Sequence, residues 1–216
     1  MKKETALQRA LATGIIPVIR TATPEDALFA AEAVLAGGIN VVEITLTVPS
    51  ATTVVSRLAK EMPEILVGAG TVLNVDAAQR CLDAGAQFLV SPAVNLKTIE
   101  FAKKENVLMI AGALTPSEVM SAWENGADLV KIFPCSQVGG ASYIRALKGP
   151  FPEIPLVPTG GVNLETCADF IAAGASALGV GGELIVKEAI RHRNTAVISE
   201  LAGQMLQAVQ TARAKN

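Results

Sequence analysis

The sequence predicts an α/β protein, namely a single-domain (β/α)8 TIM barrel with an extra N-terminal helix. Short apolar segments rich in valine and isoleucine recur at intervals of about 20 to 27 residues, and a helical pattern follows each of them. Eight such units occur, which is the number that closes a barrel. No shift in composition divides the 216 residues, so we expect residues 1–216 to form one domain.

The expected elements begin with a helix at residues 3–13, which would cover the floor of the barrel. The eight expected strands are residues 15–20, 39–46, 65–70, 87–91, 107–112, 128–133, 155–160 and 176–182. Two of the helices between them begin with a threonine cap before a proline at the first helical position, at Thr23 and Thr115. The glycines at which helices should end are Gly37, Gly85, Gly126 and Gly174.

A flavodoxin-like or Rossmann sheet is the alternative architecture for alternating strands and helices. A dinucleotide-binding Rossmann sheet carries the glycine pattern GxGxxG after its first strand. No such pattern follows residues 15–20. The strand count and the missing glycine pattern both favour the barrel.

The composition excludes several classes of function. The net charge is −2 and aromatic residues make up 4% of the chain, so no basic stripe with interleaved aromatics indicates nucleic-acid binding. No segment approaches the roughly 20 uninterrupted apolar residues of a membrane span. The N-terminal residues 1–14 carry lysines without a following apolar run, unlike a secretion signal. We therefore expect a cytoplasmic protein that binds neither nucleic acid nor membrane.

The cysteines and the histidine indicate no metal chemistry. Cys81, Cys135 and Cys167 are odd in number and widely spaced, and no CxxC occurs, so we expect reduced thiols. His192 is the only histidine, which rules out a metal site with several histidines in one chain. We expect no metal and no organic cofactor.

Lys131 lies in the apolar segment 128–133, where a buried strand is expected. A lysine there loses the hydration of its ammonium group, so it needs a partner or a depressed pKa. A neutral amine is the nucleophile that forms Schiff bases, so catalysis is one interpretation. The other is a lysine whose long side chain reaches water from the strand end.

Glu43 is the second charged residue inside an expected strand, and Thr45 and Thr47 lie on the same strand face. A carboxylate in an apolar strand must be paired, hydrogen-bonded or protonated. An ion pair with Lys131 or Arg20 would serve the structure alone. A general acid-base group beside the lysine would serve catalysis, and the same pair can do both.

Further polar or glycine residues follow other expected strands, at the barrel end where active sites form. The candidates for substrate contacts are Arg20, Thr71, Pro92, Phe133 and Thr159. The glycine pairs Gly160-Gly161 and Gly181-Gly182 follow the last two strands, where barrels often bind phosphate through backbone N–H groups. A helix is expected to begin near Asn163, just after the first pair.

Taken together, these motifs resemble one family. They are residues 43–49 (EITLTVP), 68–71 (GAGT), 91–92 (SP), 131–134 (KIFP), 148–152 (KGPFP) and 158–162 (PTGGV). The pattern is similar to that of the class I 2-keto-3-deoxy-6-phosphogluconate (KDPG) aldolases, also called KHG/KDPG aldolases. The likeness extends from about residue 15 to about residue 186.

The resemblance implies a homotrimeric TIM barrel with Lys131 as the Schiff-base lysine and Glu43 as the catalytic glutamate. It implies pyruvate contacts at Thr71 and Thr159. The phosphate contacts that it implies are Gly160, Gly161, Gly181 and Gly182.

The chain departs from some members of the family at two positions. Thr47 stands where those members carry an arginine that binds the pyruvate carboxylate, and Arg20 is the expected substitute. Glu183 stands where some members have a serine near the phosphate, and its charge should repel a phosphate unless the side chain turns outward.

The resemblance implies reversible cleavage of KDPG to pyruvate and glyceraldehyde 3-phosphate, with 4-hydroxy-2-oxoglutarate as the candidate second substrate. Several alternatives stay open at this point. One is the 2-keto-3-deoxy-6-phosphogalactonate aldolase reaction. Others are a sugar-phosphate isomerase or epimerase with Glu43 as base, and a sensor that binds a phosphorylated ligand on the same barrel.

Overall fold

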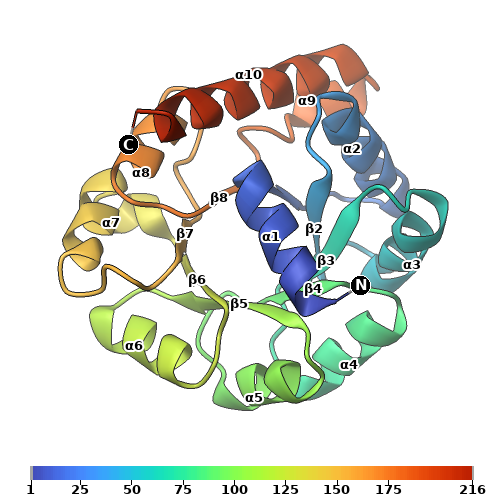
Figure 1. Ribbon diagram of the computed structural model, residues 1–216. Coiled ribbons are helices and arrows are strands. Elements are labelled where there is room, and N and C mark those ends of the chain that lie inside the picture. The colour runs from blue at the N-terminus through green and yellow to red at the C-terminus, as the bar shows by residue number, and fades with distance from the viewer. Residues whose placement is uncertain (1, 216) are drawn as a thin grey trace.

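The computed structural model describes residues 2–215. Its centre is a ring of eight parallel strands, seen end-on in Figure 1. The strands are β1 (Ile15–Ile19), β2 (Val41–Thr45), β3 (Leu66–Gly70), β4 (Phe88–Val90), β5 (Leu108–Ala113), β6 (Leu129–Ile132), β7 (Leu156–Pro158) and β8 (Leu178–Val180). They pair in the order β7-β6-β5-β4-β3-β2-β1-β8, and a bridge between Thr159 and Gly179 joins the two ends. The predicted (β/α)8 barrel is confirmed, and each strand lies within its expected segment except β5, which runs one residue further.

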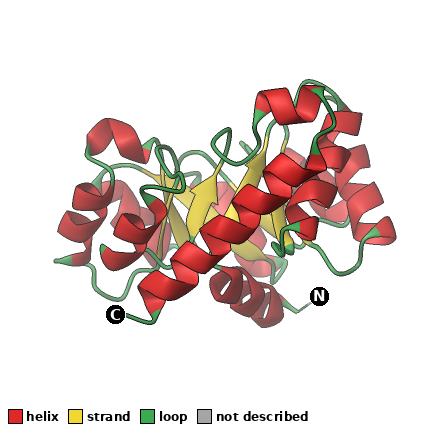
Figure 2. Cartoon of the chain, turned by 90° about the horizontal axis from the view of Figure 1, so that it is seen from above, coloured by secondary structure: helices red, strands yellow, loops and turns green. Residues whose placement is uncertain are grey.

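Helices surround the strands on the outside (Figures 1 and 2). They are α2 (Pro24–Ala36), α3 (Ala51–Glu61), α4 (Val75–Asp83), α5 (Leu96–Lys104), α6 (Pro116–Glu124), α7 (Ala141–Lys148), α8 (Cys167–Ala172), α9 (Lys187–Arg191) and α10 (Thr195–Arg213). A short 3₁₀ helix, η1 (Cys135–Val138), follows β6. No helix within residues 2–215 is long and apolar enough to cross a membrane.

The extra N-terminal helix α1 (Lys3–Thr13) lies across the floor of the barrel, as expected (Figure 1). Its small residues Ala6 and Ala10 are buried against side chains that fill the barrel interior. An ion pair of 2.7 Å between Lys3 and Asp128 ties the helix to the start of β6. The floor is therefore closed, which leaves the opposite, C-terminal end of the strands for substrate entry.

Alternate strand residues separate two apolar cores. One set points outward and packs under the helices, including Ile19, Ile44 and Ile132. The other set points inward and fills the lower part of the barrel, where it includes Ile16, Val41, Leu66, Phe88, Leu108, Leu129 and Val157. Glu43 and Lys131 continue the inward-facing set one step higher, because each lies two residues beyond an inward residue of its own strand.

The predicted helix caps are confirmed. Thr23 accepts a hydrogen bond from the Asp26 N–H, and Thr115 forms a capping box with Glu118. Hydrogen bonds from the Thr115 and Leu114 N–H groups hold the pKa of the Glu118 carboxyl below its ordinary value.

The helix ends expected at glycines are confirmed: Gly37 is the C-cap of α2, and Gly85, Gly126 and Gly174 follow the ends of α4, α6 and α8. At the end of α2 the left-handed backbone belongs to Gly38, with φ +91°. One expected helix start needs a correction. The helix after Gly160-Gly161 was expected to begin near Asn163, and it begins at Cys167. The Asn163 side chain instead accepts from the Glu165 and Thr166 N–H groups and holds a turn there.

Candidate active site

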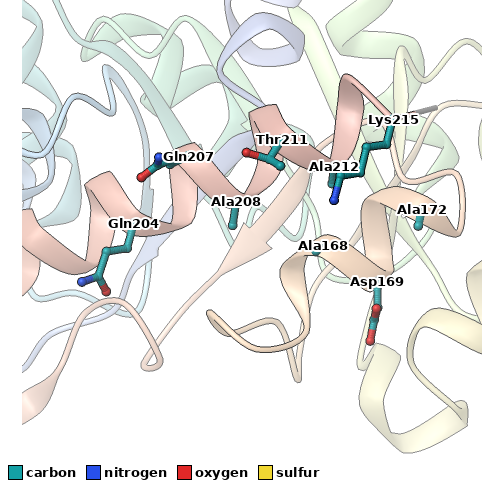
Figure 3. Close-up of a pocket in the computed structure, with 9 residues that line it drawn as sticks. All are labelled: Ala168, Asp169, Ala172, Gln204, Gln207, Ala208, Thr211, Ala212 and Lys215. Atoms are coloured by element: carbon teal, nitrogen blue, oxygen red, sulfur yellow. The ribbon is translucent and has the colours of Figure 1, made fainter.

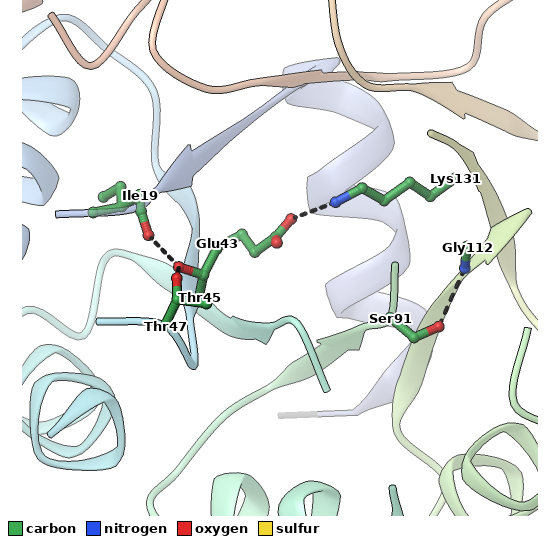
Figure 4. Close-up of polar contacts among 7 residues, drawn as sticks. All are labelled: Ile19, Glu43, Thr45, Thr47, Ser91, Gly112 and Lys131. Atoms are coloured by element: carbon green, nitrogen blue, oxygen red, sulfur yellow. Dashed lines mark hydrogen bonds and ion pairs between the residues drawn. The ribbon is translucent and has the colours of Figure 1, made fainter. Parts of the chain in front are cut away.

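The side chains of Lys131 and Glu43 meet inside the barrel (Figure 4). Lys131 Nζ lies 3.6 Å from Glu43 Oε2, and the two side chains are only 8% and 3% exposed. They come from β6 and β2, and in the closed ring three strands separate these two on either side. The pair therefore spans the barrel from opposite walls. The ion pair expected for Glu43 is present, and it is made with Lys131.

Glycines beside these two residues make room for the pair and for the groups packed around it. Gly68 pairs with Glu43 across the β2–β3 ladder, and the Phe88 ring fills the space beside it. The Glu43 carboxylate itself occupies the place where a side chain at Gly70 would lie. Its second oxygen, Oε1, is buried and has no hydrogen-bond partner within residues 2–215. One acceptor atom of Glu43 is thus available to a ligand.

Gly112 is the neighbour of Lys131 on β5, and it admits the backbone of Pro92 and Ala93 to the barrel interior. The Ser91 hydroxyl fixes that loop, because it donates to the Ala93 carbonyl at 2.8 Å and accepts from the Gly112 N–H at 3.2 Å (Figure 4). The predicted contact residue Pro92 is therefore held next to the strand that carries Lys131.

Two groups follow Lys131 along the chain. The Phe133 ring lies with its centroid 5.7 Å from Lys131 Nζ, and Phe133 is 38% exposed, so it forms an apolar part of the barrel mouth. Cys135 is buried, and burial raises the pKa of its thiol to about 11. A thiol that stays protonated at neutral pH is a poor nucleophile.

The hydroxyl groups of Thr45 and Thr47 lie 2.8 Å apart on the β2 side of the mouth. Thr45 Oγ1 also donates to the Ile19 carbonyl of β1 at 3.1 Å (Figure 4). Thr45 is completely buried, whereas Thr47 is exposed. This short chain of hydrogen bonds joins the ends of β1 and β2.

The remaining predicted residues lie around the strand ends. Thr159 is 7% exposed, and its hydroxyl, packed against Gly179, has no hydrogen-bond partner within residues 2–215. Gly160 and Gly161 have φ of +98° and +76°, and Thr71 also has a left-handed backbone, with φ +59°. Gly181 and Gly182 have open space where side chains would be, and Glu183 beside them is exposed.

Arg20 directly follows β1 and is exposed in a groove of about 440 Å³. Lys187 and Arg191 of α9 line the same groove, and so does Asp26 of α2. Asp26 is bound by Arg193 at 2.9 Å. Arg20 itself has no ion-pair partner in the part of the chain that the structure describes. It is a cation available to an anionic ligand.

A second groove, of about 530 Å³, lies between α8 and α10 (Figure 3). Its lining includes Asp169, Gln204 and Lys215 around a floor of alanines. None of the predicted site residues lines it. Its size therefore does not make it the candidate active site.

Comparison with known proteins decides the family. The family model "KDPG and KHG aldolase" matches residues 7–201. The chain belongs to the KDPG and KHG aldolase family. It is therefore an aldolase, a carbon–carbon lyase, and the predicted resemblance is confirmed.

Relatives and solved structures agree with this family. The 2-dehydro-3-deoxy-phosphogluconate aldolase of Pseudomonas aeruginosa is 37% identical over 179 residues, which is 83% of this chain and 81% of the relative. The KHG/KDPG aldolase of Escherichia coli K12 is 36% identical over 184 residues, which is 85% of this chain and 86% of the relative. KDPG aldolase from Legionella pneumophila, with pyruvate captured at low pH as a covalent carbinolamine intermediate, superposes with a TM-score of 0.86. It is 33% identical, with 93% of this chain and 97% of that one covered.

Sequence reasoning missed the supporting residues around the pair. Gly70 and Gly112 are glycines because the Glu43 carboxylate and the Pro92 backbone occupy the space of their side chains. The hydroxyl of Ser91 holds that backbone. The signal available in the sequence was glycine inside two strands, which often marks a close approach by another group.

Replacing Gly70 by alanine should remove most of the turnover and leave the fold intact. The new methyl group would overlap Glu43 Oε1, and the end of a side chain moves more easily than a strand. We expect turnover to fall by about 10²-fold, the size of effect that a misplacement of ~1 Å can produce. Steady-state kinetics and thermal unfolding measure the two effects.

The matched control is Gly203→Ala in α10, where the added methyl group meets only a carbonyl oxygen at ordinary contact distance. This variant should keep full turnover. Full turnover in Gly70→Ala would show that the position of Glu43 has no importance for the reaction.

Proposed function

We propose that this protein is a Schiff-base aldolase that cleaves KDPG reversibly to pyruvate and glyceraldehyde 3-phosphate. The observation that carries the proposal is the buried pair of Lys131 and Glu43 inside a barrel of the KDPG and KHG aldolase family. The covalent carbinolamine of the Legionella relative supports an amine nucleophile in this family. The name of the Escherichia coli relative supports 4-hydroxy-2-oxoglutarate as a second substrate.

The reaction begins at Lys131. Its amine attacks the C2 ketone of the 2-keto-3-deoxy acid, and the resulting carbinolamine loses water to give an iminium. When the C4 hydroxyl loses its proton, the C3–C4 bond breaks and its electron pair moves into the iminium. The aldehyde leaves, and an enamine of pyruvate stays on Lys131. Protonation at C3 and hydrolysis then release pyruvate and restore the amine.

Glu43 moves the protons in this scheme. It takes the proton of the C4 hydroxyl during cleavage, and it serves the water that leaves and returns at C2. Its position fits this role, because Oε2 faces the lysine amine while the buried Oε1 has no protein partner within residues 2–215. The carboxylate also balances the positive charge of the iminium on Lys131.

The two ends of the substrate take different partners. Arg20 binds the carboxylate of the 2-keto acid, since it is an exposed cation just beyond the C-terminal end of β1 and Thr47 has no charge to offer. Thr71, Pro92, Phe133 and Thr159 contact the pyruvate part. The distal phosphate lies at Gly160-Gly161 and Gly181-Gly182, where left-handed and unobstructed glycines allow backbone N–H groups to reach an anion.

The first prediction tests the nucleophile. Borohydride reduction in the presence of pyruvate should attach the three-carbon unit to the peptide that contains Lys131, as measured by mass spectrometry. Lys131→Arg keeps the charge next to Glu43 but loses the nucleophile, so it should remove essentially all turnover while the fold survives.

Lys148 serves as the internal control for this labelling. Its Nζ donates to the Pro152 and Ile154 carbonyls, and burial lowers its pKa. It should remain unlabelled. An adduct on Lys148 alone, or no adduct at all, would contradict the mechanism and favour an isomerase or a ligand sensor on this barrel.

The second prediction tests proton transfer. Glu43→Gln should lower turnover by about 10²- to 10⁴-fold, the usual contribution of an acid-base group. The adduct on Lys131 should still form, more slowly. If the variant instead kept its turnover and lost thermal stability, Glu43 would be a structural partner of Lys131 only.

The third prediction separates the two ends of the substrate. Arg20→Ala should weaken every 2-keto acid substrate, phosphorylated or not, by about 1.5–3 kcal/mol for a lost charged hydrogen bond. Glu183→Ser should improve phosphorylated substrates by about 2- to 5-fold through loss of an exposed repulsive charge, and leave the others nearly unchanged.

Kinetics on a matched pair of substrates, with and without the phosphate, test both variants. If Arg20→Ala harmed only the phosphorylated member, Arg20 would be the phosphate clamp instead. A panel with gluconate-type and galactonate-type substrates and 4-hydroxy-2-oxoglutarate decides the physiological substrate.

The fourth prediction concerns assembly, where the family resemblance implies a homotrimer. Large apolar side chains are exposed on consecutive β–α units, at Leu73, Leu96, Met120 and Trp123. Such a surface favours association of subunits. Sedimentation should give three times the 22.3 kDa mass of the chain. A monomer at all concentrations would contradict the proposal.

A further inference from the structure

The hydrogen bonds of Thr45 and Thr47 have a defined direction. A threonine hydroxyl has one hydrogen to donate, and a carbonyl oxygen can only accept. Thr45 Oγ1 lies 3.1 Å from the Ile19 carbonyl and gives it that hydrogen. In the 2.8 Å contact between the two hydroxyls, Thr47 must then be the donor. The chain therefore runs from Thr47 to Thr45 to the Ile19 carbonyl.

This chain of hydrogen bonds ends at the peptide group that links Ile19 to Arg20. Ile19 is the last residue of β1, and its pairing with Ile44 is the last rung of the β1–β2 ladder. Arg20 lies one position beyond that ladder. The Thr45 hydroxyl bonds to the carbonyl of the peptide bond between Ile19 and Arg20. It thereby fixes the plane of that peptide and the direction in which Arg20 starts.

The same chain of hydrogen bonds determines whether the Thr47 hydroxyl can donate to a substrate or only accept from it. Its only hydroxyl hydrogen points back to Thr45, so its free lone pairs are all that remain for a ligand at the mouth. Lone pairs repel a carboxylate, which also carries only acceptors. A substrate carboxylate is therefore disfavoured at the Thr47 hydroxyl and favoured at a cation such as Arg20, which follows the end of β1.

We infer that Thr45 is a positioning residue, whose hydroxyl orients Arg20 toward the substrate carboxylate, and that Thr47 keeps Thr45 in its donating orientation. The inference rests on the proposed function, in which Arg20 binds that carboxylate. A simpler role for the hydroxyl is to satisfy a buried polar group. That role predicts a change in stability, whereas positioning predicts a change in substrate binding.

Thr45→Val tests the inference because valine has nearly the same shape and no hydroxyl. We expect KM for 2-keto acid substrates to rise by about 3- to 10-fold, the factor expected for one lost neutral hydrogen bond, with kcat within about 2-fold of the parent. Thr45→Ser should restore most of KM. Thr98→Val is the matched control, since Thr98 is equally buried but its hydroxyl has no hydrogen-bond partner within residues 2–215. It should leave KM and kcat unchanged.

The double variant Arg20→Ala/Thr45→Val gives the decisive measurement. If Thr45 acts through Arg20, Thr45→Val should change KM by less than about 2-fold once Arg20 is absent, because coupled residues are not additive. Equal effects of Thr45→Val in both backgrounds would overturn the inference. So would a loss of thermal stability with KM unchanged.

Two further outcomes separate this inference from the proposed function. If Arg20→Ala raises KM and Thr45→Val does not, the positioning role alone is overturned. If Arg20→Ala itself has no effect on KM, both the carboxylate assignment and the positioning role are overturned. Borohydride labelling of Lys131 at saturating pyruvate should persist in Thr45→Val, and its absence from the parent protein would instead overturn the Schiff-base mechanism.

Discussion

The buried ion pair of Lys131 and Glu43 is the constraint on which the rest of the barrel depends. Each charge is almost fully removed from water, so either one alone would be strongly destabilising. The pair forms because closing the ring of eight strands sets β2 and β6 opposite each other. The apolar layer below it, with α1 across the floor, excludes water from that side. A site of low dielectric strengthens the attraction between the two charges of the pair, and also the attraction between Glu43 and any positive charge that develops on the lysine.

The same constraint explains where side chains are missing. The pair and the groups packed around it need space on the inner wall, and side chains are missing there at Gly68, Gly70 and Gly112. Each glycine admits a specific group: the Phe88 ring, the Glu43 carboxylate and the Pro92 backbone. The interior is therefore close-packed below the pair, where the inward-facing apolar side chains lie. The pair itself lies toward the C-terminal ends of the strands, the end at which the active sites of such barrels form.

Much of this arrangement could be predicted from the sequence, and the reasons are local. Lys131 and Glu43 stand out because charge is rare in apolar strands, and Thr23 and Thr115 mark helix starts through cap chemistry. Relations between distant segments were beyond sequence reasoning. The direction of the hydrogen bonds from Thr47 to Ile19 depends on how β1 and β2 end side by side. The grouping of Arg20 with Lys187 and Arg191 depends on where α9 packs. A helix start was expected near Asn163, but the side chain of Asn163 accepts hydrogen bonds from following N–H groups and holds a turn there.

The two cations Lys131 and Arg20 lie in opposite environments: Lys131 is buried and paired, whereas Arg20 is exposed and has no ion-pair partner within residues 2–215. Inside the barrel, Lys131 has a fixed partner because water is absent and an unpaired charge would be costly. At the rim, water solvates Arg20, so leaving it without a partner costs little. The one carboxylate in its groove, Asp26, is held by Arg193, whose guanidinium also lies 5.0 Å from the Phe29 ring centroid. Asp26 is thus kept from neutralising Arg20. The barrel core therefore holds a compensated pair of charges, whereas the end of β1 is followed by an exposed cation without an ion-pair partner in residues 2–215.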